Sequence, residues 1–64
     1  MVDYVYGIVR STTKDRKVLG VKTDAGEDLL LNLPGLGLDL PNINVGDRLR
    51  ITEIQGRIHT LEKR

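Results

Sequence analysis

Apolar and polar side chains alternate along much of this chain. Residues 4–10 (YVYGIVR), 17–23 (KVLGVKT) and 48–54 (RLRITEI) each place apolar side chains at every second position, and the first is also dense in β-branched and aromatic residues. A period of two residues is typical of a β-strand with one buried face. The pattern therefore predicts a strand over each of these ranges.

Two further segments are expected to be strands, although their patterns are less regular. Residues 27–33 (EDLLLNL) place leucines on one face, and a helix here would be too short, because Pro34 disfavours helical backbone in the residue before it. In residues 57–62 (RIHTLE), Ile58 and Leu61 are three positions apart. They can share a face only if a β-bulge intervenes.

Turn-forming segments separate the predicted strands. Residues 11–16 contain no apolar side chain, and Asp24-Ala25-Gly26 and Gln55-Gly56 are typical of tight hairpins, because glycine adopts positive φ without a steric clash. The longer link, residues 34–45 (PGLGLDLPNINV), is interrupted by proline and glycine but rich in leucine. We expect it to plug the barrel, with room for a short helical turn over residues 40–43 but not for a full amphipathic helix.

Five short strands, with one long link after the third, are the order of a small Greek-key barrel. We predict a single all-β domain over residues 1–64, with an OB-like five-stranded barrel as the first choice and an SH3-like barrel as the alternative. A chain of 64 residues without cysteine is near the lower limit for a fold held by one apolar core. The expected core residues are Leu19, Val21, Leu29, Leu31, Leu49 and Ile51.

Three short motifs carry a family resemblance. G-x-V-x-S at residues 7–11, D-x-G at 24–26 and V-G-D-R-L at 45–49, with alternating leucines between them, resemble small bacterial OB-fold domains of uncharacterised function. Those domains are similar in outline to periplasmic copper and silver carriers, which bind metal through Met, His and Trp. Of that set this chain has only His59 and Met1, so the resemblance implies no metal carriage.

The end of the chain carries a second resemblance. Residues 45–63 are similar to the closing hairpin of swapped-hairpin DNA-binding transcription factors, whose pattern the first half of the chain lacks.

Charge and hydropathy exclude several classes of partner. Ten basic and nine acidic residues give a net charge of +1, which is too balanced for a polybasic nucleic-acid or membrane binder. No apolar run approaches the roughly 20 residues of a membrane span, and the first residues lack the pattern of a signal peptide. We expect no membrane association and favour a cytoplasmic location, although the absence of cysteine leaves the redox compartment open.

Residues that support catalysis or metal binding are sparse. The single imidazole, His59, lies on the last predicted strand, and Glu27 and Asp28 are adjacent, so that they point to opposite faces of a strand. The glycines of residues 35–39 (GLGLD) lack the flanking strand and helix of a dinucleotide-binding motif, and the carboxylates beside Asp24 lack the spacing of a calcium loop. We expect no enzymatic activity, no cofactor and no metal site.

The outward face of the first three predicted strands is unusually apolar. Two tyrosines near basic side chains match the stacking and charge that bind single-stranded nucleic acid on OB surfaces, and the same composition suits a protein interface. A barrel too small to hide every apolar residue would show the same face without any function. Because the net charge is small, protein contact or self-association is the favoured function, with single-stranded nucleic-acid binding as the alternative. The candidate binding residues are Tyr4, Tyr6, Ile8, Arg10, Lys22, Leu30, Arg48 and Arg50.

Overall fold

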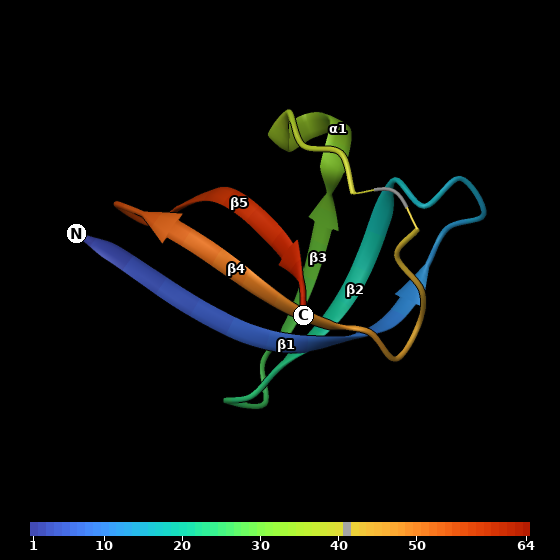
Figure 1. The fold of residues 1–64 in the computed structure, drawn as a ribbon, viewed down its shortest axis with the longest axis horizontal. Coiled ribbons are helices and arrows are strands. Elements are labelled where there is room, and N and C mark those ends of the chain that lie inside the picture. The colour runs from blue at the N-terminus through green and yellow to red at the C-terminus, as the bar shows by residue number, and fades with distance from the viewer. Residues whose placement is uncertain (41) are drawn as a thin grey trace.

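A computed structural model describes residues 1–40 and 42–64, which form a five-stranded antiparallel sheet and one helical turn (Figure 1). Each predicted strand is present, and its bounds differ from the prediction by at most two residues. The elements are β1 (Val2–Thr12), β2 (Val18–Thr23), β3 (Asp28–Asn32), α1 (Leu33–Leu36), β4 (Arg48–Ile54) and β5 (Arg57–Lys63).

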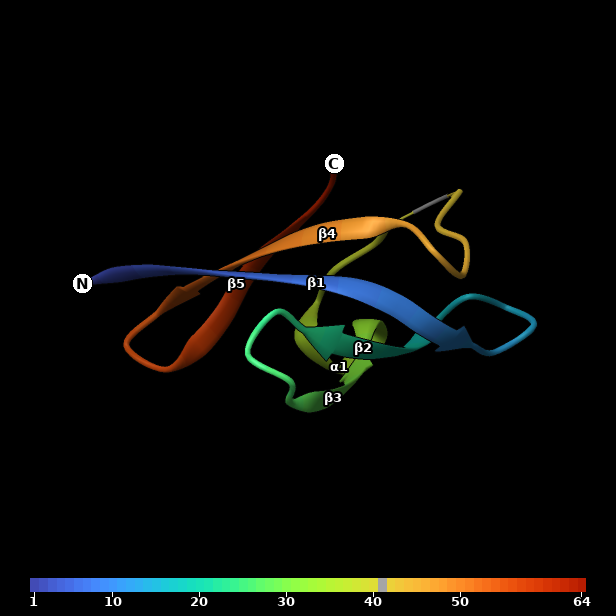
Figure 2. The same ribbon diagram turned by 90° about the horizontal axis from the view of Figure 1, so that it is seen from below.

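The strands are ordered β3-β2-β1-β4-β5 across the sheet. Hairpins join β1 to β2 and β2 to β3, and the long link after β3 then brings β4 beside β1, which is the Greek-key arrangement. The sheet curls into a half-barrel that is open between β3 and β5 (Figure 2). OB folds are partly open five-stranded Greek-key barrels, so the predicted all-β, OB-like class is confirmed.

The apolar core is built from every strand except β5, together with the long link. The fully buried apolar residues include five of the six predicted core residues, and Leu29 is the exception because it is only partly buried. Leu29 lies nearer the β2–β3 hairpin than the buried Leu31, and it borders a groove that leaves part of its side chain accessible. The buried apolar residues are Val9, Leu19, Val21, Leu31, Leu33, Ile43, Leu49 and Ile51.

A β-bulge explains the irregular spacing of apolar residues in the last strand. The register of β4 with β5 shifts between Thr52 and Glu53, which leaves His59 as the extra residue of β5. As a result, Ile58 and Leu61 both pack against the core. The bulge that their spacing requires is confirmed.

The long link plugs the half-barrel as predicted. Ile43 is completely buried, and Leu38 and Leu40 pack against the core. The one helical turn precedes residues 40–43: α1 begins directly after β3, with Pro34 in its first turn, where the missing N–H is not needed. Pro41 lies outside the described residues, and Leu40 carries no helical structure. The described part of the chain contains no helix long and apolar enough to cross a membrane.

The two faces of β3 should differ sharply in their contribution to stability. Leu31→Ala is expected to lower the free energy of unfolding by about 2 to 5 kcal/mol, because it empties a fully packed site. Leu30→Ala is the matched control: this side chain is 78% exposed, and we expect a change below about 0.5 kcal/mol. Denaturant unfolding at low protein concentration measures both. Equal losses would contradict the assignment of the two faces.

A second prediction concerns Gly7, where β1 and β2 approach closely. A Cβ at this position would lie 2.7 Å from the backbone oxygen of Lys22, which cannot rotate away. Gly7→Ala is therefore expected to lower the free energy of unfolding by about 1 to 3 kcal/mol. In Gly20→Ala the new methyl meets only the rotatable hydroxyl of Ser11, so this control should lose less in the same unfolding experiment.

Candidate interaction surface

Tyrosine and arginine side chains from neighbouring strands meet on the convex face of the sheet. Tyr6 on β1 is the cross-strand partner of Arg50 on β4, and the Arg50 guanidinium carbon lies 5.2 Å from the centroid of the Tyr4 ring. That distance is within the range of a cation–π contact. The tyrosines remain accessible, with 55% of Tyr4 and 37% of Tyr6 exposed. We call Tyr4, Tyr6 and Arg50 the tyrosine patch.

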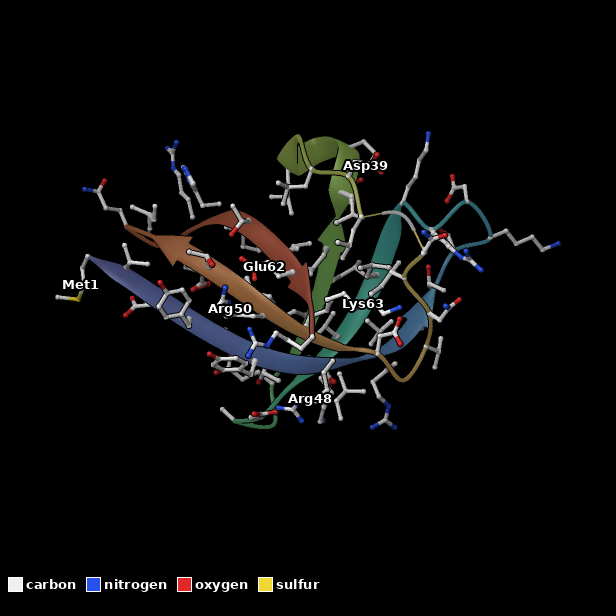
Figure 3. The ribbon with its side chains drawn as sticks, in the orientation of Figure 1. Met1, Asp39, Arg48, Arg50, Glu62 and Lys63 are labelled. Carbon is white, nitrogen blue, oxygen red and sulfur yellow. The ribbon has the colours of Figure 1, made fainter. Side chains whose placement is uncertain are left out.

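Glu62 on β5 fixes the arginine of this patch. Arg50 Nη2 donates a hydrogen bond to Glu62 Oε2 at 2.6 Å, and the two residues are cross-strand partners (Figure 3). The hydrogen bond to Glu62 and the charge of that carboxylate raise the pKa of Arg50 above its ordinary value. The charged guanidinium thus contacts both the Tyr4 ring and the Glu62 carboxylate.

Two further cations of the candidate set, Lys22 and Arg48, lie beside Ile8. In the register of the sheet, Ile8 is flanked by Lys22 on β2 and by Arg48 on β4. Lys22 Nζ lies 3.4 Å from a carboxylate oxygen of Asp28, and Arg48 Nη2 lies 3.1 Å from one of Asp24. Both charges are thus balanced within the chain, and the half-buried Ile8 separates the two ion pairs.

Arg10 and Leu30 belong to a different part of the convex face. Arg10 is the extra residue of a bulge in β1, where the register with β2 shifts between its two neighbours. Arg10 and Leu30 border a shallow hollow of about 270 Å³ over Gly20, which has no side chain to fill it. Leu30 is two strands away from Tyr6 and several residues further along the sheet. The candidate residues therefore form a tyrosine patch, a charged row around Ile8, and a separate hollow.

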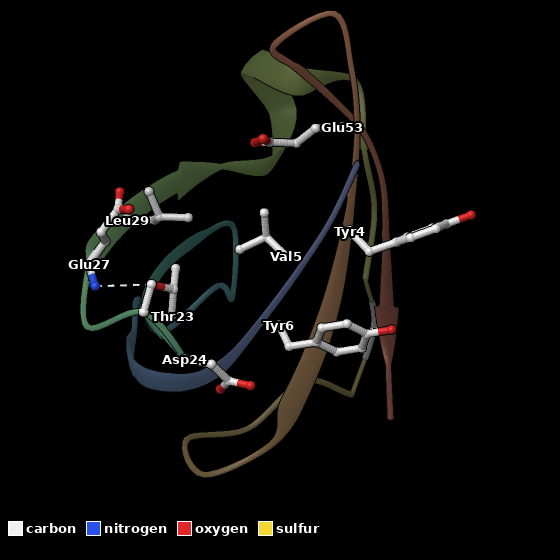
Figure 4. A pocket seen from close by; sticks show the side chains of 9 residues that line it. Tyr4, Val5, Tyr6, Thr23, Asp24, Glu27, Leu29 and Glu53 are labelled. Atoms are coloured by element: carbon white, nitrogen blue, oxygen red, sulfur yellow. Dashed lines mark hydrogen bonds between the residues drawn. The ribbon is translucent and has the colours of Figure 1, made fainter. Parts of the chain in front are cut away.

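The concave side of β1 carries a groove that sequence reasoning missed. It has a volume of about 390 Å³, an apolar floor that includes Val5 and Leu29, and acidic residues that include Glu27 and Glu53. Tyr4 and Tyr6 also border this groove, and Figure 4 shows their rings on the other side of β1 from Val5. Its lining comes from β1, from the β2–β3 hairpin and from β4, segments far apart in the sequence, so no local sequence pattern reveals it.

Sequence reasoning also missed the carboxylates that balance the cations. The hairpin around Asp24-Ala25-Gly26 places Lys22 opposite Asp28, so this ion pair could have been predicted from the position of the turn. The pairing of Arg50 with Glu62 is harder to predict, because the bulge at His59 shifts the register of β5 by one residue.

Among the described residues, no three or more His, Cys, Asp or Glu side chains are placed to hold a metal ion. His59 is exposed at the bulge in β5.

Comparisons of the chain with protein-family models, with curated proteins and with solved structures found no match.

Removing the carboxylate that holds Arg50 tests the geometry of the patch. Glu62→Ala should change the free energy of unfolding by less than about 1 kcal/mol, because the ion pair is partly exposed. The NMR signals of the Tyr4 ring and of the Arg50 side chain should shift, since the guanidinium loses its anchor. In the control Glu53→Ala, on the other face of β4, both sets of signals should stay in place. Unchanged signals in Glu62→Ala would show that Arg50 does not depend on Glu62.

Proposed function

We propose that this chain is a non-catalytic interaction module, and that its tyrosine patch binds a protein partner. The observation that supports this most strongly is the pair of accessible tyrosine rings next to an arginine held by Glu62. Tyrosine and arginine are enriched at protein interfaces and at the positions that dominate their binding energy. A side chain that is already ordered loses little conformational entropy when a partner covers it.

Charge pairing favours a protein partner over single-stranded nucleic acid. Lys22, Arg48 and Arg50 each lie within 3.4 Å of a carboxylate oxygen of the same chain. Binding of a nucleic-acid backbone relies on cations that exchange their counterions for phosphates. Here each of these cations would first have to break its ion pair with a carboxylate. Breaking the ion pairs reduces the free energy gained when the cations bind phosphates.

The tyrosine patch should contribute to binding more than to folding. We expect Tyr6→Ser to change the free energy of unfolding by no more than about 1 kcal/mol, yet to lose protein partners that the unmodified domain captures from a lysate. Leu36→Ser is a matched control, since Leu36 on α1 is also 37% exposed but lies away from the patch. It should retain those partners. If Tyr6→Ser unfolds the domain, or captures the same proteins as the control, the proposal is wrong.

Nucleic-acid binding makes a different prediction for the same protein. If the patch bound single strands, affinity for an oligothymidine would fall steeply as salt rises, because bound phosphates release counterions. We expect no such salt-dependent binding by the unmodified domain. Clear binding that Tyr6→Ser removes would favour the nucleic-acid alternative instead.

A further inference from the structure

The outer edge of β3 carries unpaired backbone groups. β3 lies at one rim of the sheet, and no described strand pairs with its far side (Figure 2). At the hairpin end, the Thr23 amide donates to the Glu27 carbonyl at 2.8 Å. Hydrogen-bonded and non-bonded pairs alternate along an antiparallel ladder, so every second residue from Glu27 bonds to β2. Asp28 and Leu30 therefore direct their N–H and C=O groups outward.

The two rims of the sheet differ in their protection against strand pairing. β5 contains a bulge at His59 and the cations Arg57 and Lys63, features that commonly prevent edge-to-edge contact. β3 pairs with β2 without any shift of register, and its centre is three consecutive leucines. Its one charged residue, Asp28, lies at the end of the strand next to Lys22. An unprotected apolar edge of this kind favours the addition of another strand.

We propose that the partner of this edge is a second copy of the same chain, which pairs antiparallel to β3 about a two-fold axis at Leu30. In this register Leu30 lies opposite its own copy, and both direct their backbone groups toward each other. Asp28 then lies opposite Asn32 of the copy, and Leu29 opposite Leu31. No like charges face each other, and the exposed Leu30 side chains cover one another.

The neighbouring register is less favourable. A shift that centres the axis on Asp28 would place two carboxylates directly opposite each other, which destabilises a strand pair. A two-fold contact uses the same edge on both copies and leaves no free β3 edge, so assembly stops at two. The charge of Asp28 therefore disfavours this shifted register, and the two-fold symmetry limits the assembly to two copies.

This inference goes beyond the proposed function, because it uses the rim of the sheet and leaves the tyrosine patch free. A five-residue strand on each side is small compared with the roughly 1,200 Å² that a stable interface buries. We therefore expect the dimer to depend on concentration.

Sedimentation equilibrium over a concentration series tests the proposal. The unmodified domain should approach twice its 7.2 kDa mass as its concentration rises toward about 1 mM. Leu30→Lys, which places two cations on the axis, should remain at 7.2 kDa. The controls Leu36→Lys and Tyr6→Ser should dimerise like the unmodified domain, so failure of the tyrosine-patch proposal would leave this result intact.

A measurement on the unmodified domain keeps the test independent of how the variant folds. Hydrogen exchange of the Asp28 and Leu30 amides should slow at least about tenfold between dilute and concentrated samples, because only a new strand can bond them. A mass that stays at 7.2 kDa at the highest concentration would overturn the proposal. Growth beyond two copies, or a Leu30→Lys variant that dimerises normally, would also overturn it. The same holds if hydrogen exchange at these amides does not change with protein concentration.

Discussion

The whole sheet depends on the continuity of β1. This strand pairs with β4 over Val2–Ile8 and with β2 over residues 7–12, so Gly7 and Ile8 have strand partners on both sides. Backbone hydrogen bonds extend this overlap to Tyr6, which accepts from Asp24, and to Val9, which bonds to Gly46 and Asp47. The halves β2–β3 and β4–β5 are also joined by the Arg48–Asp24 ion pair and by the buried residues that pack between them, Ile43 of the link included. A backbone that must pass so close to β2 leaves no room for a side chain at Gly7. Gly7 thus lies where β1 pairs with both of its neighbours, at the centre of the five-stranded sheet.

The convex face carries charge without presenting a strong field. Lys22, Arg48 and Arg50 are each matched by a carboxylate on an adjacent strand or hairpin, and the net charge of the chain is +1. Such a face offers shape and ring contacts more than long-range attraction. Partner choice is therefore expected to depend on complementary packing around the tyrosines, with little electrostatic steering.

Alternation of side chains was enough to predict the strands, because a strand with one buried face imposes a period of two whatever its neighbours are. It also predicted which face of β1 carries Tyr4 and Tyr6, and the spacing of Ile58 and Leu61 required the bulge that the structure contains. The alternation of side chains predicted that Leu29 is buried like Leu31, but it cannot show that a groove beside the β2–β3 hairpin leaves Leu29 partly accessible.

The composition of the candidate site was harder to predict than the fold. The alternation of side chains predicted that Arg10 and Leu30 lie on the same face as the tyrosines. Their distance from the tyrosines within that face depends on the strand order and on the bulge at Arg10, which the alternation does not contain. Whether Lys22 and Arg50 are available to a ligand depends on the residues opposite them, Asp28 and Glu62, which are known only once the register is fixed. Pairwise register is a property of the assembled sheet, so a single-strand pattern does not contain it.

The Greek-key link also determines the order in which the sheet can assemble. The hairpins β2–β3 and β4–β5 join residues close in sequence, whereas the nearest partners in the β1–β4 ladder, Ile8 and Arg48, are 40 positions apart. Closing a long loop loses more chain entropy before any contact compensates for it, and non-local pairing slows folding. The meeting of β1 with β4 is therefore expected to be the late step of folding, and until it occurs both tyrosines lie on a strand with one unpaired side.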